Sequence, residues 1–260
     1  MRNTPRDDDP DSNNDPTAEL PSQAGPGNSG KKRSFWQRLP VVILTALVLS
    51  FLLQTFVARV YLIPSESMEP TLHGCAECTG DRIVVDKLVY RFSDARPGDV
   101  VVFKGPASWN TRYVSNRSAN PVLRTGEIFL SSFGLAPPDE NDLVKRVIAT
   151  GGQTVQCRNS EGGVTVDGHL LIEPYLDNPQ MRVAASTNPC LGPEFGPTVI
   201  PEDAVWVMGD NRTNSADSRY HQTDPYLGAV PMDNIIGKVR AIILPPRRWG
   251  MVSSPEIQSE

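Results

Sequence analysis

The sequence predicts a mainly β protein, in which a single N-terminal transmembrane helix precedes an extracytoplasmic β-sheet core with an inserted, smaller β subdomain. Short runs of β-branched residues recur between turn signals after residue 60. The 24 prolines and 20 glycines interrupt regular elements too often for a helical bundle. No long amphipathic helical pattern competes with the strand-like runs in this part of the chain.

Residues 1–38 are expected to form a disordered cytoplasmic tail. Acidic side chains are scattered there among Pro, Ser, Asn and Gly, and large apolar side chains are almost absent from the first thirty positions. Such a segment buries too little surface to offset the entropy lost on ordering it. A solvated tail is therefore favoured over a partner-binding segment, and we assign it no function.

Residues 39–60 are predicted to cross a lipid bilayer once. Positions 40–58 hold no charged side chain, and a helix of this length reaches about 28 Å, close to the hydrocarbon thickness. Basic side chains concentrate before this segment, at Lys31, Lys32, Arg33 and Arg38, whereas only Arg59 follows directly. The positive-inside rule then places the tail in the cytoplasm and residues 61–260 outside.

A cleaved signal peptide is the main alternative for this segment. Cleavage after Ala58 would require a small side chain at the position where Phe56 stands, so an uncleaved anchor is preferred. No later apolar run is long enough to span a bilayer, since residues 241–244 are far too few. The sequence therefore predicts a single-pass protein.

The predicted strands of the outer domain are runs of β-branched residues between turn signals. They are residues 81–86, 99–103, 143–149, 204–208 and 237–244. Two stretches rich in Pro, Ser and Gly, about 105–141 and 153–200, are interpreted as insertions into one core. In the second insertion, Asp167 and Gly168 predict a β-hairpin, and a Pro-rich loop is expected after it.

The chain has four cysteines, and an extracytoplasmic location favours disulfides. Cys157 and Cys190 are the first predicted pair. Cys75 and Cys78 form a CxxC, which fits either a small disulfide loop or half of a zinc site. We prefer disulfides because zinc tetrads usually consist of two close pairs, whereas this chain has one.

Residues 63–72 directly follow the predicted anchor and are the first candidates for chemistry. Ser65 and Ser67 lie two residues apart beside two prolines, whose rings limit backbone freedom. Serine and proline in a turn usually serve only the turn, so this segment indicates catalysis only if a base can be found for it.

Histidine and lysine are the candidate bases. His73, His169 and His221 have no metal-binding spacing and HExxH is absent, so no metal site is predicted. A Ser-His-Asp triad that uses His73 or His221 stays open, because triad partners meet in space rather than in sequence. A lysine acts as a base only where desolvation lowers its pKa, which directs attention to lysines on apolar strands.

Two lysines after the anchor have apolar neighbours on their own strand face. Lys145 is flanked by Leu143 and Val147, and Lys87 is flanked in the same way by two valines. Most strand lysines extend to water. Periodicity alone therefore neither chooses between these two lysines nor establishes catalysis.

Four segments together resemble those of the bacterial type I signal peptidases. Residues 64–72 are similar to the nucleophile segment of that family, 145–152 to its lysine segment and 209–219 to its third signature, and 96–103 also match. With the preceding anchor, the likeness extends over residues 40–245. Thr213 stands where the family often has an acidic residue, but the serine and the ion pair of that signature are in place.

The resemblance implies a Ser-Lys dyad. Ser67 would be the nucleophile, and Lys145 would be the neutral amine that takes its proton and later returns it. Ser65 would bind the oxyanion together with the backbone N–H of Ser67, where negative charge develops in the tetrahedral intermediate.

The third signature would support this dyad. By the resemblance, Ser215 would orient the amine of Lys145. Asp217 and Arg219 would form an ion pair behind the site, although a purely structural pair fits these positions as well.

The resemblance also implies the substrate: signal peptides of secreted preproteins, cleaved after small-x-small sites similar to Ala-x-Ala by a serine endopeptidase of the cell membrane. Shallow apolar pockets would select the small side chains. The candidates for lining them flank the two dyad residues and are Ile63, Met68, Leu72, Leu143 and Val144. Core packing accounts equally well for each of them.

The expected partners are therefore preprotein signal peptides and the lipid bilayer, and no cofactor is expected. Nucleic acid is not an expected partner, because the net charge of -5 and the pI near 5.3 offer no basic surface. Two other interpretations are a soluble, self-cleaving Ser-Lys protease of the repressor type and a non-catalytic, membrane-tethered binding domain. The anchor argues against the first, and the match at residues 209–219 argues against the second.

Overall fold

The computed structural model describes residues 35–75, 78–109 and 142–258, with isolated positions at 120, 121, 123 and 126. Most of the predicted tail and most of the insertion at 105–141 lie outside these residues. The chain divides into two compact units, Met1–Val42 and Ile43–Glu260. The described part of the first unit is the beginning of helix α1, and the β structure belongs to the second.

Helix α1 (Phe35–Phe56) contains Pro40 and ends earlier than the predicted anchor. Val57 is a turn residue, and β1 begins at Ala58, where β-branched and aromatic side chains favour an extended chain. The outer sheet therefore starts three residues before the predicted position 61. Across the described ranges, we find no helix that combines the length and the apolar character needed to traverse a bilayer.

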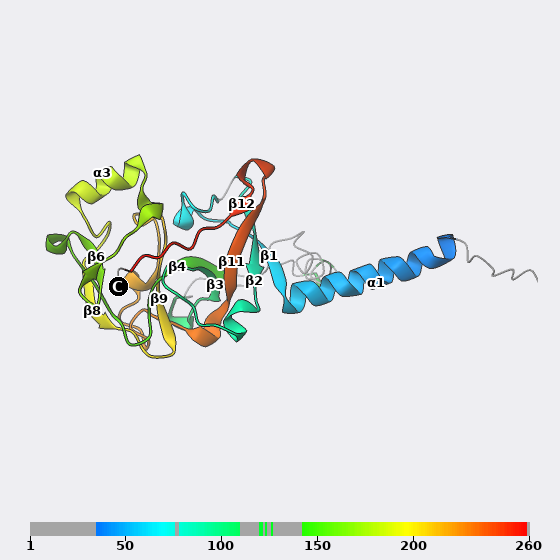
Figure 1. Ribbon diagram of the computed structural model, residues 1–260, viewed down its shortest axis with the longest axis horizontal. Coiled ribbons are helices and arrows are strands. Elements are labelled where there is room, and N and C mark those ends of the chain that lie inside the picture. The colour runs from blue at the N-terminus through cyan, green and yellow to red at the C-terminus, as the bar shows by residue number, and fades with distance from the viewer. Residues whose placement is uncertain are drawn as a thin grey trace, which may run out of the picture. The chain divides into compact units, whose positions relative to one another are not determined.

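The main body is an eight-stranded antiparallel sheet with the order β1-β2-β11-β3-β4-β9-β10, and β12 pairs with β11 (Figure 1). Its strands are β1 (Ala58–Leu62), β2 (Arg82–Asp86), β3 (Val100–Lys104), β4 (Asp142–Thr150), β9 (Ala204–Met208), β10 (Val230–Pro231), β11 (Ile235–Leu244) and β12 (Gly250–Met251). The five predicted strands correspond to β2, β3, β4, β9 and β11, so the mainly β prediction is confirmed.

A second, four-stranded sheet lies between β4 and β9 in the sequence, with the order β7-β6-β5-β8. Its strands are β5 (Thr154–Arg158), β6 (Gly163–Val166), β7 (His169–Leu170) and β8 (Phe195–Val199). The predicted hairpin joins β6 to β7. Asp167 and Gly168 have φ values of 52° and 84°, as a two-residue hairpin turn with both central residues left-handed requires.

The predicted disulfide joins Cys157 in β5 to Cys190, with an S–S distance of 2.06 Å. Both cysteines are fully buried in the core of this part of the domain. A second disulfide joins Cys75 and Cys78, so the CxxC forms a small loop.

The predicted Pro-rich loop contains a helix, α3 (Pro179–Thr187), which the sequence analysis missed. The side chain of Asn178 accepts a hydrogen bond of 3.0 Å from the N–H of Met181, and Pro179 occupies the first turn. An Asn-Pro pair is a helix-start signal, since the capping oxygen satisfies a free N–H and proline needs no donor there. The helix has only nine residues, too few for a helical hydrophobic periodicity to be recognised in the sequence.

The central strands of the main sheet are buried on both faces. All five residues of β9 are buried, and β4 is buried from Lys145 to Ala149. Strand β4 pairs with β3 on one side, where Val101 faces Lys145, and with β9 on the other. A lysine at this place in the sheet is withdrawn from water on a rigid element.

Candidate active site

Ser67 lies in a short 3-10 turn, η1 (Glu66–Met68), shortly after β1. Met68 and Leu72 are 1% and 0% exposed and anchor this turn in the hydrophobic core. The N–H of Leu72 donates to the carbonyl of Met68 at 2.9 Å. Core packing of these apolar side chains thus fixes the segment, while Ser67 is half-buried and Ser65 is exposed.

Lys145, in the middle of β4, meets the nucleophile segment from 78 residues away in the sequence. Its Nζ lies 2.7 Å from the Oγ of Ser67 and 3.0 Å from the carbonyl oxygen of Val144. Only 4% of Lys145 is exposed. The fold therefore brings together the two residues predicted to form a dyad.

Burial lowers the pKa of Lys145 from an ordinary 10.5 to about 8, because a charged ammonium loses its hydration in this environment. The carboxylates of Asp217 and Asp210 act in the opposite direction, and Arg219 adds to the lowering. A substantial fraction of the amine is then neutral near physiological pH. A neutral amine with a free lone pair can accept the proton of a serine hydroxyl.

The hydroxyl of Ser65, an exposed residue, lies close to the Ser67–Lys145 pair. Its Oγ is 3.3 Å from the Oγ of Ser67. A hydroxyl at this distance from a nucleophile is close to the position where an oxyanion would develop during acyl transfer.

The segment after β9 packs directly against the nucleophile turn. The N–H of Asn211 donates to the carbonyl of Ser67 at 3.1 Å, and the side-chain amide of Asn211 donates to the carbonyl of Glu66 at 3.1 Å. A Cβ at Gly209 would overlap the carbonyl oxygen of Ser67 and the hydroxyl of Ser215. Close approach of the two backbones thus requires glycine at this position.

Asp217 and Arg219 form the predicted ion pair, with Arg219 Nε 2.8 Å from Asp217 Oδ1, and both side chains are fully buried. Burial alone would raise the pKa of Asp217, but the hydrogen bond and charge of Arg219, with the Gly209 N–H, hold it below its usual range. Asp217 therefore stays ionised. Ser215 is 7% exposed, and its hydroxyl also helps to hold the pKa of Asp217 low. Its predicted role in orienting Lys145 stays a prediction.

Comparison with known proteins identifies the family of this chain. The family described as "Signal peptidase, peptidase S26" matches residues 36–244. A "Signal peptidase I" from Mycobacterium tuberculosis is 59% identical over 228 residues, which cover 86% of this chain and 77% of that protein. A "Probable signal peptidase I" from Mycobacterium leprae is 57% identical over 240 residues, which cover 88% of this chain and 83% of that protein.

The chain belongs to the bacterial type I signal peptidases. It is thus a serine peptidase, a hydrolase, which excludes the non-catalytic binding domain considered above. A solved signal peptidase I from Enterococcus faecalis aligns with a TM-score of 0.36 and 22% identity, over 56% of this chain and 97% of that chain, and this likeness carries no weight here.

A second buried ion pair of this signal peptidase was not anticipated. Arg146 binds Asp210 in a bidentate manner, with Nε to Oδ1 at 2.8 Å and Nη2 to Oδ2 at 2.7 Å. Thr71 donates to Asp210 Oδ2 at 2.5 Å, which ties the nucleophile segment to the same carboxylate. The available signal was an arginine inside an apolar strand, since a buried charge must be paired.

The other candidate bases of the peptidase have different surroundings. His73 pairs with Glu69, and the ring of His221 stacks on Trp109 with centroids 4.4 Å apart. Lys87 lies just beyond the end of β2 rather than within the strand. Neither of the two histidine contacts involves Ser67.

The five predicted pocket residues of the peptidase fall into two groups. Ile63, Met68 and Leu72 are core residues, at most 3% exposed. Leu143 and Val144 are partly exposed at the start of β4. Core packing therefore explains the first three well, and a role of any of the five in substrate binding stays a prediction.

Proposed function

We propose that Ser67 and Lys145 are the catalytic dyad with which this peptidase cleaves signal peptides. The observation that carries the proposal is the buried amine of Lys145, 2.7 Å from the hydroxyl of Ser67, with a pKa lowered to about 8. Such a lysine performs the role that histidine has in a Ser-His-Asp triad.

In the proposed reaction, Ser67 Oγ attacks the carbonyl carbon of the scissile peptide bond while its proton moves to Lys145 Nζ. The C–N bond then breaks, and Lys145 returns the proton to the leaving amine, which becomes the N-terminus of the mature protein. Neutral Lys145 then takes a proton from water as the water oxygen attacks the ester carbonyl. The bond between Ser67 Oγ and that carbonyl carbon breaks, the signal peptide leaves with a new C-terminal carboxyl group, and Lys145 returns the proton to Ser67.

Ser65 is proposed to stabilise the oxyanion of this reaction, together with the backbone N–H of Ser67. The exposed position of Ser65 and its 3.3 Å distance from the nucleophile support this role. Ser215 is proposed to orient Lys145, and its buried hydroxyl, which lies against Gly209, is close to the nucleophile turn. The Asp217–Arg219 pair is proposed to hold the loop that carries Ser215.

The proposed cleavage site is small-x-small, similar to Ala-x-Ala. Leu143 and Val144 directly precede Lys145 and are partly exposed, so they are the better placed of the five candidates to contact substrate. Ile63, Met68 and Leu72 would shape the pockets from the core side. Large residues one or three positions before the cut should then abolish cleavage by steric overlap.

We propose further that the peptidase is held at the cell membrane by its N-terminal segment, with the catalytic domain outside. The charge-free run at residues 40–58 and the basic cluster before it support this proposal. Many apolar side chains of α1 are exposed in the structure, for example Val41 and Leu44, each 63% exposed. Sedimentation of the full chain with membranes after alkaline extraction would test it; recovery in the soluble fraction would contradict it.

The dyad is tested by two lysine variants and a preprotein cleavage assay. Lys145→Ala should be inactive, whereas Lys87→Ala should cleave normally, and circular dichroism should show that both fold. The reverse result would reassign the base while leaving the peptidase activity in place.

A further inference from the structure

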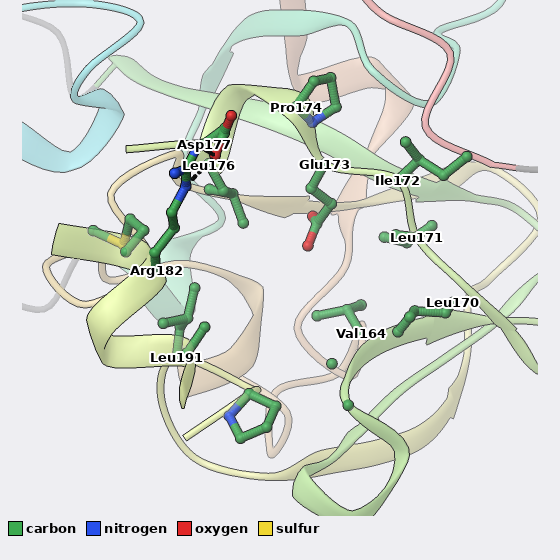
Figure 2. Close-up of a pocket in the computed structure, with 15 residues that line it drawn as sticks. Val164, Leu170, Leu171, Ile172, Glu173, Pro174, Leu176, Asp177, Arg182 and Leu191 are labelled. Atoms are coloured by element: carbon green, nitrogen blue, oxygen red, sulfur yellow. Dashed lines mark hydrogen bonds and ion pairs between the residues drawn. The ribbon is translucent and has the colours of Figure 1, made fainter. Parts of the chain in front are cut away.

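Glu173 and Tyr175 lie in the inserted subdomain, the second insertion at about residues 153–200. Their side chains contact Arg212 and Arg146, which lie close to the candidate active site. Tyr175 belongs to the short turn η5 (Pro174–Leu176), which Glu173 directly precedes. Glu173 lines a cavity of about 430 Å³. Figure 2 shows its carboxylate directed inward. Only 14% of this side chain is exposed, so the carboxylate depends on partners within the protein.

Its main partner is Arg212, which follows β9 and has a side chain only 1% exposed. Arg212 Nη1 donates to Glu173 Oε2 at 3.1 Å, and Nη2 donates to Oε1. The hydroxyl of Tyr175 donates to Glu173 Oε1 at 2.8 Å and accepts from Arg212 Nη2 at 3.2 Å. Bidentate pairs have narrow geometry, so these three side chains fix one another.

Arg212 transmits this constraint to the nucleophile through Gly209. Its Nε donates to the Gly209 carbonyl at 3.1 Å, while the Gly209 N–H donates to Asp217 at 3.0 Å. Gly209 packs so tightly on the Ser67 carbonyl and on Ser215 that not even a Cβ fits between them. A displacement of Gly209 would therefore displace Ser67 as well.

Tyr175 also contacts Arg146, the residue that follows Lys145 in β4. The Arg146 guanidinium lies 4.0 Å from the centre of the Tyr175 ring, a cation–π contact in a buried setting. Asp210, the partner of Arg146, also accepts a hydrogen bond from Thr71, a residue of the nucleophile segment. One turn of the insertion thus contacts both Arg212 and Arg146.

We infer that Glu173 and Tyr175 are positioning residues that hold the Ser67–Lys145 pair in register by fixing Arg212 and Arg146. The inference rests on the proposed dyad. It gives the inserted subdomain a part in catalysis, because small displacements of reacting groups cost up to about 100-fold in rate.

Glu173→Gln, which keeps the shape of the side chain and removes its charge, should lower kcat about 10- to 100-fold with KM nearly unchanged. The loss should persist at about pH 10, where the Lys145 amine is neutral, since the defect is one of position. Tyr175→Phe should give a smaller loss in kcat. Glu161→Gln, at an exposed site in the same subdomain, is the matched control and should behave as wild type. Wild-type kcat in Glu173→Gln, or a loss that disappears at high pH, would overturn the inference.

A double variant separates positioning from simple stability. Glu173→Gln leaves Arg212 buried without its anion, so the protein should be less stable; adding Arg212→Met should restore stability by removing the uncompensated charge. It should not restore kcat, because the donor to Gly209 is gone. Recovery of kcat together with stability would show a structural role only. Ser67→Ala in the same assay tests the dyad separately, since activity there would refute the dyad whatever the Glu173 variants do.

Discussion

Replacing Lys145 by methionine should abolish activity. The free energy of unfolding of the variant, compared with that of wild type, should be higher at neutral pH than at high pH. The folded protein has lowered the pKa of this lysine from 10.5 to about 8. At about 1.4 kcal/mol per pKa unit, protonating the buried amine costs about 3 kcal/mol of stability. Methionine fills a similar volume and does not carry a proton.

The direction in which stability changes with pH follows from proton binding. Below about pH 8 the amine is protonated in both the folded and the unfolded chain, and the whole cost is present. Between about 8 and 10.5 the unfolded chain binds more protons than the folded one, so the stability of wild type rises with pH. The free energy of unfolding of Lys145→Met minus that of wild type should fall by about 2 to 3 kcal/mol between about pH 7 and pH 10.

Urea unfolding followed by tryptophan fluorescence at both pH values measures this difference. Lys104→Met removes an exposed lysine from the neighbouring strand β3 and is the matched control. A difference between Lys145→Met and wild type that is the same at both pH values would refute the assignment of Lys145 as a desolvated amine.

Three further predictions concern the same site and its surroundings. The kcat/KM for preprotein cleavage should rise with pH through about 8 as Lys145 loses its proton, and Lys145→Arg should be inactive because arginine stays protonated; an active arginine variant would refute a neutral base. Ser65→Ala should lower kcat by about 10²- to 10³-fold, as expected for loss of one oxyanion donor, and an unchanged kcat would remove Ser65 from that role. Cys157 and Cys190 should resist alkylation in the native, oxidised protein, and labelling of both detected by mass spectrometry would contradict their pairing.

The sequence predicted the central strands well, because β3, β4 and β9 are short runs rich in β-branched and other apolar residues, as strands buried on both faces are. The boundary between α1 and β1 was harder to predict from the sequence. Apolar and β-branched residues continue without a break across Val57, so pairing of β1 with β2, a tertiary event, sets the end of the helix.

The candidate site shows a similar division. Periodicity treated Lys87 and Lys145 alike, and the family resemblance pointed to Lys145. The fold shows that Lys87 lies just beyond the end of β2, whereas Lys145 is buried beside Ser67. The pairs Arg146–Asp210 and Arg212–Glu173 join residues 64 and 39 positions apart. Such pairs leave no periodic trace in the sequence, because each partner is chosen by tertiary packing.

The central claim, that Ser67 is the nucleophile, is tested most directly by the rate at which Ser67→Ala cleaves a preprotein with an Ala-x-Ala site. The variant removes one oxygen from a half-buried position and should fold as wild type does. We predict that the purified wild-type protein releases the mature product, whereas Ser67→Ala releases none at any pH between about 7 and 10. Cleavage at the same bond by folded Ser67→Ala, at a rate comparable to wild type, would contradict the account.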